Sequence, residues 1–240
     1  MINNHQMKST YCSEINSLGV VLFMGRNDCS YSNRIKRLLE KSSKKFYYFE
    51  SSRVGEKINK KYLKLNYDYI FCFRSFYILK KNILNKVNNA AINFHPGPPE
   101  YRGTGSVNYA LYKNSKFYGC TAHLINEKVD NGKIIDIKKF NISKKNSLSE
   151  VLIKTYEVMT SLAISTIKNI KRNPDFIENQ ILKNKNIKWS NKIKTLKDLN
   201  DFYQINTNIK KNNFLNKIRA TDTPKFKPYI KLHGKKFILE

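Results

Sequence analysis

Two polar side chains near the middle of the chain have the types and the spacing for acyl-transfer chemistry. Asn93 and His95 close a short apolar run, and residues 96–105 after it contain three prolines and three glycines. Proline removes backbone donors and glycine permits positive φ, so regular structure should end at His95. On a strand, residues two apart share a face, which places this amide beside this imidazole. An amide can donate to an oxyanion and an imidazole can move a proton, although both could instead satisfy loop carbonyls.

Apolar runs alternate with helical patterns over most of the chain, and they predict the elements that carry this pair. This alternation indicates βαβ units, so the expected fold is α/β, with a Rossmann-like, mostly parallel sheet flanked by helices. Ligands bind such sheets at the carboxyl ends of strands, where Asn93 and His95 stand. Strands are predicted over Leu18–Met24, Lys45–Glu50, Tyr67–Phe73, Ala90–His95, Phe117–Ile125 and Lys133–Phe140, and helices over Ser30–Lys41, Val54–Leu65, Lys80–Val87, Val107–Lys113, Ser147–Lys171 and Asn208–Ala220.

Two local sequence patterns in the second half of the chain predict a helix start and a terminal turn. Ser147 and Glu150 have the spacing of a capping box at the start of the long helix. The last residues alternate around His233-Gly234, which predicts a terminal β-hairpin. We therefore expect an N-terminal extension over 1–17, a main domain over 18–174 and a small C-terminal region of helix and hairpin over 175–240.

The formal net charge of +27 on 240 residues has two readings. A phosphate-neutralising surface would indicate nucleic-acid binding. The lysines are spread over the whole chain, however, and no nucleic-acid-binding motif accompanies them. We interpret the charge as mainly compositional, and we note that a positive field would favour any phosphate-bearing substrate.

The spacing of the cysteines and the length of the apolar runs indicate the cellular compartment. The four cysteines form no CxxC pair and no set with metal-ligand spacing, so we expect a reducing compartment and no metal. Cys72 and Cys120 lie in apolar runs and are predicted to be small core residues. No apolar run is long enough for a membrane span and the first residues lack an apolar signal, which predicts a cytoplasmic protein.

Four short motifs together carry a resemblance to a family. They are Asn93-x-His95, Pro99-x-Tyr101-Arg102-Gly103, Gly119-x-Thr121-x-His123 and Asp130-x-Gly132. In this order and spacing they resemble the folate-dependent formyltransferases, over roughly residues 18–172. The resemblance implies transfer of a formyl group from 10-formyltetrahydrofolate to an amine, without a metal. It also implies that Asn93, His95 and Asp130 are the catalytic residues.

The same resemblance implies binding residues. His123 also matches a family position, but we interpret it as a core or loop histidine whose hydrogen bonds are made within the protein and which has no chemical role. Arg26 and Arg102 are candidates for a diphosphate, although a surface ion pair is nearly as good an explanation for each. The expected folate contacts are Phe76, Tyr77, Ile78, Val129 and Gly132, and the expected substrate contacts are Arg26, Asn27, Tyr101 and Arg102.

The C-terminal region bears on which amine is formylated. Its Lys217 to Pro224 segment and its closing hairpin resemble the sugar nucleotide N-formyltransferases. This implies a dTDP-linked 4-amino-4,6-dideoxysugar as the substrate and surface polysaccharide (O-antigen) biosynthesis as the setting. We expect a homodimer; the terminal hairpin could pair across its two-fold axis or instead cover the core of its own chain. The alternatives are a methionyl-tRNA or glycinamide ribonucleotide formyltransferase, and a non-catalytic basic RNA-binding protein on the same scaffold.

Overall fold

The computed structural model describes residues 17–224 and 226–239, so Cys12 and nearly all of the predicted N-terminal extension lie outside it. The chain divides into two compact units. Unit 1 comprises residues 17–95, Ala122–Asp136 and Thr160–Asn186, and unit 2 comprises Pro96–Thr121, Ile137–Met159 and the chain from Ile187 onward. The predicted division at residues 17 and 174 follows different boundaries and stays a prediction.

A parallel sheet forms the centre of unit 1. The order of its strands is β2-β1-β3-β4-β5-β6, and the pairings of β1 with β2, β1 with β3 and β3 with β4 are parallel. The last two strands pass from one unit into the other along the chain. The strands are β1 (Val20–Arg26), β2 (Lys45–Ser51), β3 (Tyr67–Phe73), β4 (Val87–His95), β5 (Phe117–Leu124) and β6 (Ile134–Asn141).

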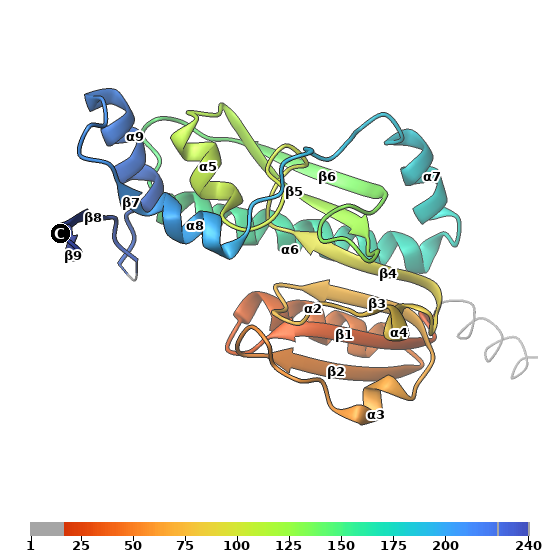
Figure 1. Cartoon of the computed structure of the whole chain (residues 1–240). Coiled ribbons are helices and arrows are strands. Elements are labelled where there is room, and N and C mark those ends of the chain that lie inside the picture. The colour runs from red at the N-terminus through yellow and green to blue at the C-terminus, as the bar shows by residue number, and fades with distance from the viewer. Residues whose placement is uncertain (1–16, 225, 240) are drawn as a thin grey trace, which may run out of the picture. The chain divides into compact units, whose positions relative to one another are not determined.

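The continuous apolar runs of the sequence form the buried strands of unit 1. The side chains of β1 from Val21 to Met24 are all buried, as expected of a strand that is covered on both faces. Helix α2 lies against β1 and β2 (Figure 1). Its Ile35 and Leu39 side chains are fully buried. The helices of this unit are α2 (Ser30–Ser42), α3 (Lys60–Leu63), α4 (Lys81–Leu84), α7 (Phe176–Lys183) and the second half of α6 (Leu148–Arg172).

Unit 2 contains a second core and the C-terminal elements. Helix α5 (Ser106–Tyr112) packs against α9 (Lys211–Thr221) (Figure 1). The Asn108 side-chain amide donates to the carbonyl oxygen of Ala220 at 2.7 Å. A small sheet has the order β7-β8-β9. Its strands are β7 (Gln204–Ile205), β8 (Tyr229–Leu232) and β9 (Lys235–Ile238), and α8 (Leu196–Phe202) precedes them.

Most of the predicted elements are confirmed within one to three residues of their predicted ends. The capping box is present, because Ser147 and Glu150 each accept from the other's backbone N–H. The hairpin turns at His233-Gly234, where both residues have positive φ, as a two-residue hairpin turn requires. The predicted helix over 54–65 is wrong except for α3, and α7, α8 and β7 were not predicted.

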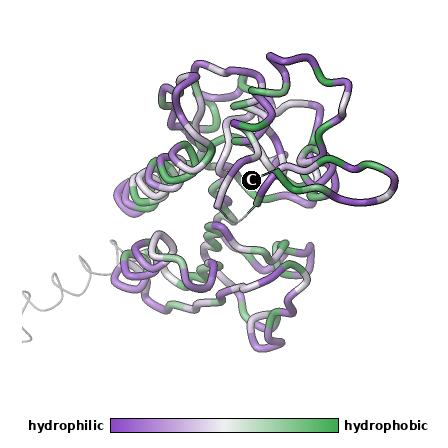
Figure 2. Tube along the Cα trace, turned by 90° about the vertical axis from the view of Figure 1, so that its left-hand side faces the viewer, coloured by the Kyte–Doolittle hydropathy of each residue, from purple (hydrophilic) through white to green (hydrophobic). Residues whose placement is uncertain are grey.

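Hydrophilic segments occur along the whole trace of both units (Figure 2). This distribution agrees with basic residues that are spread over the chain rather than gathered in one segment. No helix in the described part of the chain is both long and apolar enough to cross a bilayer.

The core of unit 1 gives a first testable prediction. Ile70 in β3 is fully buried, whereas Ile153 on α6 is 56% exposed. Ile70→Ala removes buried methyl groups and leaves a cavity, so it should lower the free energy of unfolding by about 2–5 kcal/mol. Ile153→Ala, the control with identical chemistry, should change it by less than about 0.5 kcal/mol. Urea unfolding measures both; equal effects would contradict the assignment of Ile70 to the core.

Candidate active site

Asn93 and His95 lie at the carboxyl end of β4, in unit 1. Asn93 pairs in register with Cys72 of β3, and Phe94 pairs with Phe73. The ring of Phe94 packs 6.3 Å from the ring of Phe73, centroid to centroid. Phe94 thereby fills the core while its two polar neighbours turn to the other face, as the alternation predicts.

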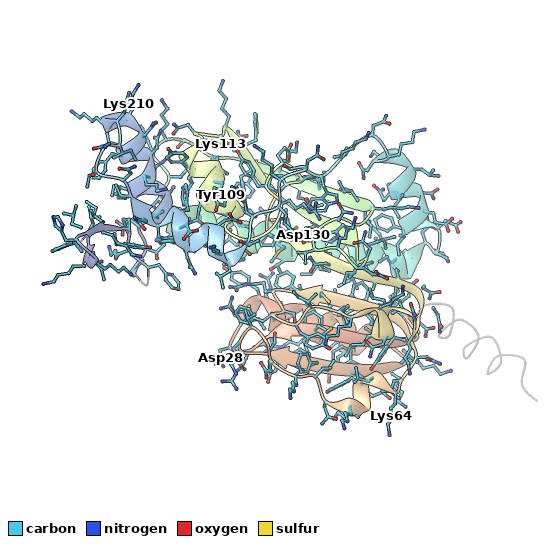
Figure 3. All side chains as sticks on the ribbon, in the orientation of Figure 1. Asp28, Lys64, Tyr109, Lys113, Asp130 and Lys210 are labelled. Atoms are coloured by element: carbon cyan, nitrogen blue, oxygen red, sulfur yellow. The ribbon has the colours of Figure 1, made fainter. Side chains whose placement is uncertain are left out.

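A loop over residues 125–133 delivers the carboxylate. It is closed at its base, where the N–H of Leu124 donates to the carbonyl oxygen of Lys133 at 2.9 Å, and it is tied to β4 by the N–H of Ile125, which donates to the carbonyl oxygen of Ala91 at 2.8 Å. Asn126 ties the loop internally: its Oδ1 accepts from the N–H of Lys128 at 3.0 Å and its Nδ2 donates to the oxygen of Asn131 at 3.2 Å. Asp130, labelled in Figure 3, lies in this loop with φ of 44°. Aspartate tolerates this left-handed conformation better than most residues.

Asp130 joins the two strand residues to each other. Its Oδ2 lies 3.2 Å from Nδ1 of His95, and its Oδ1 accepts from Nδ2 of Asn93 at 3.4 Å. Asp130 is 8% exposed and His95 is 3% exposed. A buried carboxylate is costly unless hydrogen-bond donors satisfy it, so these contacts orient the imidazole and the amide as well as the carboxylate. The structure thus brings together the three residues that the resemblance implies to be catalytic.

A second imidazole completes this group. His123, on β5, is 2% exposed and its Nε2 lies 3.1 Å from Nδ2 of Asn93. The same nitrogen lies 3.5 Å from Oδ1 of Asp130. Nδ1 of His123 lies 2.8 Å from the carbonyl oxygen of Leu124. The sequence pattern did not reveal the contact with Asn93, because it joins β5 to a residue 30 positions earlier in the chain.

A cavity opens beside this group. Its empty volume is about 700 Å³ when counted out to its open mouth. Three members of the group (Asn93, His123 and Asp130) line it, but His95 does not. The other lining residues come from the 72–79 stretch and from the 125–130 part of the loop, and they are Cys72, Ser75, Tyr77, Ile78, Leu79, Ile125, Asn126, Glu127, Lys128 and Val129.

Three of the five expected folate contacts line this cavity, namely Tyr77, Ile78 and Val129. Phe76 and Gly132 are not among its lining residues. Gly132 instead passes close to β5, where a Cβ would lie 1.6 Å from the oxygen of Leu124. The glycine is therefore needed for the close approach of the two backbones.

The segment after β3 is held by Ser51, which is fully buried at the end of β2. Its hydroxyl accepts from the N–H of Phe76 at 2.8 Å and lies 3.2 Å from the hydroxyl of Ser75. The guanidinium of Arg26 lies 4.3 Å from the centroid of the Phe76 ring. Arg26 and Phe76, predicted to bind different ligands, therefore contact each other, and neighbouring Asn27 donates from its N–H to the oxygen of Ser51 at 3.1 Å.

The other two expected substrate contacts lie in unit 2. The hydroxyl of Tyr101 lies 2.6 Å from the hydroxyl of Ser115, and its ring packs 6.2 Å from that of Tyr118. The backbone oxygen of Arg102 accepts from the N–H of Lys194 at 3.1 Å. Tyr101 also lines a second cavity, whose other walls include Pro98, Phe117 and Lys139.

The thiols of unit 1 have opposite electrostatic environments. Burial raises the pKa of Cys72 to about 12. Burial also raises the pKa of Cys29, but hydrogen bonds from Ser32 and the guanidinium of Arg74, 3.2 Å from Sγ, outweigh it and lower the pKa overall. Within residues 17–224 and 226–239, no cluster of three or more His, Cys, Asp or Glu side chains has the arrangement of a metal site.

Comparison with known proteins identifies the family. Residues 23–167 match the formyl transferase family, which is more than half of the chain. The chain belongs to the formyl transferase family. The methionyl-tRNA formyltransferase of Campylobacter lari is 32% identical over 132 residues, which cover 53% of this chain and 42% of that protein. The chain thus spans less than half the length of this curated relative.

Solved structures show the same fold over nearly the whole chain. A 4-N formyltransferase from Francisella tularensis superposes with a TM-score of 0.67 at 19% identity, covering 92% of this chain and 96% of that one. The N-formyltransferase from Helicobacter canadensis, solved with folinic acid and dTDP-3-aminofucose, has a TM-score of 0.64 at 18% identity and covers 89% and 84% of the two chains. The predicted α/β fold and family are confirmed.

The two thiols provide a prediction about the electrostatics of unit 1. Cys29 and Cys72 are 5% and 6% exposed, so access to them is similar. The thiolate is the reactive form, and at pH 8 Cys72 is almost entirely the thiol whereas Cys29 carries more thiolate. Iodoacetamide should therefore modify Cys29 faster than Cys72, as measured by peptide mass spectrometry. Equal rates for the two cysteines in the native protein, or faster modification of Cys72, would contradict these environments. In denaturant, where both environments are lost, the two rates should become equal.

Proposed function

We propose that this chain transfers a formyl group from 10-formyltetrahydrofolate to the amino group of a dTDP-linked 4-amino-4,6-dideoxysugar. The observation that carries the proposal is the convergence of three side chains, with Asp130 Oδ2 3.2 Å from His95 Nδ1 and Oδ1 3.4 Å from Asn93 Nδ2. An amide donor, an imidazole and a carboxylate are the groups that acyl transfer to an amine requires. Membership of the formyl transferase family supports the same reaction.

The proposed mechanism gives each residue one role. The amine nitrogen of the sugar attacks the formyl carbon, and the carbonyl oxygen becomes an oxyanion that accepts from Nδ2 of Asn93. Collapse of the tetrahedral carbon breaks its bond to N10 of the folate, which takes up a proton as the attacking nitrogen loses one. Asp130 accepts from Nδ1–H of His95, so Nε2 is the nitrogen of that ring that would carry the proton. An oxyanion donor of this kind is worth about 3–4 kcal/mol.

The cavity beside the three residues suits the pterin end of a folate. Its walls combine apolar side chains (Ile78 and Val129) with the aromatic ring of Tyr77 and several polar groups. This mixture is typical of a small-molecule site, in which apolar area supplies affinity and a few polar atoms fix orientation. Phe76 and Gly132 would shape the walls indirectly. Phe76 contacts the guanidinium of Arg26, and Gly132 allows the close approach of the loop to Leu124.

The sugar substrate is supported by likeness rather than by contacts. The N-formyltransferase from Helicobacter canadensis was solved with dTDP-3-aminofucose, and it covers most of this chain. We propose Arg26, Asn27, Tyr101 and Arg102 as the residues that bind the nucleotide sugar. A cytoplasmic homodimer that supplies formylated sugars for surface polysaccharide is part of the same proposal.

The curated relatives favour a second candidate, because the methionyl-tRNA formyltransferases act on a charged tRNA according to their name. A direct assay separates the candidates. The protein is incubated with 10-formyltetrahydrofolate and each acceptor in turn: dTDP-4-amino-4,6-dideoxyglucose, its 3-amino isomer, glycinamide ribonucleotide and methionyl-tRNA. We expect formylation of the 4-amino sugar at the highest kcat/KM. Transfer to none of them, together with salt-sensitive RNA binding, would overturn the proposal.

The role of Asn93 gives a sharp prediction, because β4 offers a matched control. Asn93→Ala removes the oxyanion donor and should lower kcat by at least about 100-fold. Asn88→Ala changes the same residue type at the exposed beginning of the same strand, and it should leave kcat within about twofold. Steady-state kinetics on the formylated acceptor measure both. An Asn93→Ala enzyme that keeps near-normal kcat and a normal circular dichroism spectrum would reject this role.

The cavity wall gives a prediction about folate affinity. Ile78 is 66% exposed and lines the cavity, whereas Ile153 is 56% exposed on α6 and does not. Ile78→Asp removes apolar area from the wall of the cavity and adds a charge that a bound pterin would have to desolvate, so we expect KM for 10-formyltetrahydrofolate to rise by at least about tenfold. Ile153→Asp should leave it within about twofold. If both variants have the same KM, the folate does not bind in this cavity.

A further inference from the structure

We propose that His123 is a positioning residue, whose neutral imidazole holds the side-chain amide of Asn93 in the orientation that presents an N–H to the reacting carbonyl. The inference rests on the proposed function and extends it, because the sequence alone indicated only a satisfied core or loop histidine at this position. Three interatomic distances support it, two at the ring of His123 and one at the amide of Asn93.

The first distance fixes the tautomer of the ring. Nδ1 of His123 lies 2.8 Å from the carbonyl oxygen of Leu124. A carbonyl oxygen can only accept, so Nδ1 must carry the hydrogen. In a neutral imidazole the other nitrogen, Nε2, is then an acceptor with no hydrogen. The ring is 2% exposed, so this acceptor needs a donor from the protein.

The second distance fixes the amide. Nε2 of His123 lies 3.1 Å from Nδ2 of Asn93. The two ends of an Asn amide have the same shape and differ only in hydrogen bonding, so an acceptor at this place selects the NH₂ end. Without the imidazole, the amide could rotate by 180° and place its oxygen where the NH₂ group stands. The oxygen would repel an oxyanion, so that rotamer could not support the reaction.

The third distance leaves one amide hydrogen for the substrate. The NH₂ group of Asn93 has two hydrogens, and the first is directed to His123. The second makes only a long contact, 3.4 Å, with Oδ1 of Asp130. Hydrogen bonds of this length are weak, so a developing oxyanion in the cavity can compete for that hydrogen. One amide hydrogen of Asn93 thus fixes the side chain on His123, and the other remains for the oxyanion.

The charge of the ring matters for the same reason. Nε2 of His123 also lies 3.5 Å from Oδ1 of Asp130. A protonated ring would donate from Nε2 to that carboxylate and would no longer accept from Asn93. Asp130, already engaged with His95 through Oδ2, would then bind two imidazoles, and the amide would be released. The proposal therefore requires the neutral ring.

A double-mutant cycle tests the coupling. His123→Leu removes the acceptor and should lower kcat by at least about tenfold while KM for 10-formyltetrahydrofolate stays within about threefold. In the Asn93→Ala background the same change should cost less than about twofold, because the group it positions is gone. His123→Gln, whose side-chain oxygen can accept from Asn93 while its NH₂ donates to Leu124, should recover part of kcat. Equal losses in both backgrounds would overturn the proposal and indicate a structural role only.

The tautomer can be measured without any assay of activity. In ¹⁵N-labelled protein at neutral pH, the imidazole of His123 should show a protonated Nδ1 and an unprotonated Nε2, with the signal assigned by its loss in His123→Gln. His233, exposed in the terminal hairpin, serves as the reference for a histidine without such a constraint. A ring protonated at Nε2 would overturn the proposal, even if the enzyme formylates its acceptor as expected. Conversely, the expected tautomer in a protein that formylates nothing would leave the geometry intact and refute the proposed function.

Discussion

The buried carboxylate of Asp130 is the interaction on which the rest of the site depends. Its two oxygens lie against different partners, His95 on one side and Asn93 with His123 on the other. A carboxylate with so little exposure requires donors on both oxygens, and those donors lose their freedom to turn when they satisfy it. One ionised group thus orients two side chains of β4, the imidazole of His95 and the amide of Asn93.

The surrounding backbone serves to bring this carboxylate to the end of β4. The loop over residues 125–133 is tied at its base and across its middle by Asn126, and it packs so closely on β5 that position 132 has no room for a Cβ. The segment after β3 also lines the cavity, and it is held by Ser51, whose hydroxyl accepts from the backbone N–H of Phe76. The cavity walls are therefore short loops fixed by hydrogen bonds to strands of a parallel sheet. Such a frame can hold reacting groups in place before a ligand arrives.

Much of this could be predicted from the sequence, because it depends on local patterns. The buried strands are continuous apolar runs, the end of β4 is set by the prolines after His95, and the terminal turn is set by two residues that accept positive φ. The pairing of Asp130 with Asn93 and His95 came from the resemblance of linked motifs rather than from periodicity. The basic stretch over 54–65 has apolar residues at helical spacing, yet only α3 is helical, because Gly55 has a φ of 83° and Asn59 caps the start of α3 by accepting from the N–H of Lys61.

The remaining features arise from contacts that spacing does not encode. Arg26 over the ring of Phe76, the hydroxyl of Ser51 beneath the same segment, and the ring of His123 against Asn93 each join residues at least 24 positions apart. A histidine on a buried strand has the same sequence signature whether it only fills space or holds a reacting amide. Its role becomes visible only when the partners of both ring nitrogens are known.

The most direct test of this account is the rate of formyl transfer to dTDP-4-amino-4,6-dideoxyglucose by Asp130→Asn compared with the unmodified protein. The substitution preserves size but removes the charge and replaces one acceptor oxygen with a donor, so residue 130 can no longer accept from His95 and Asn93 at the same time. We expect kcat to fall by at least about 100-fold, with an unchanged far-ultraviolet circular dichroism spectrum. A folded Asp130→Asn protein that transfers formyl at a rate within a few-fold of the original would contradict the account.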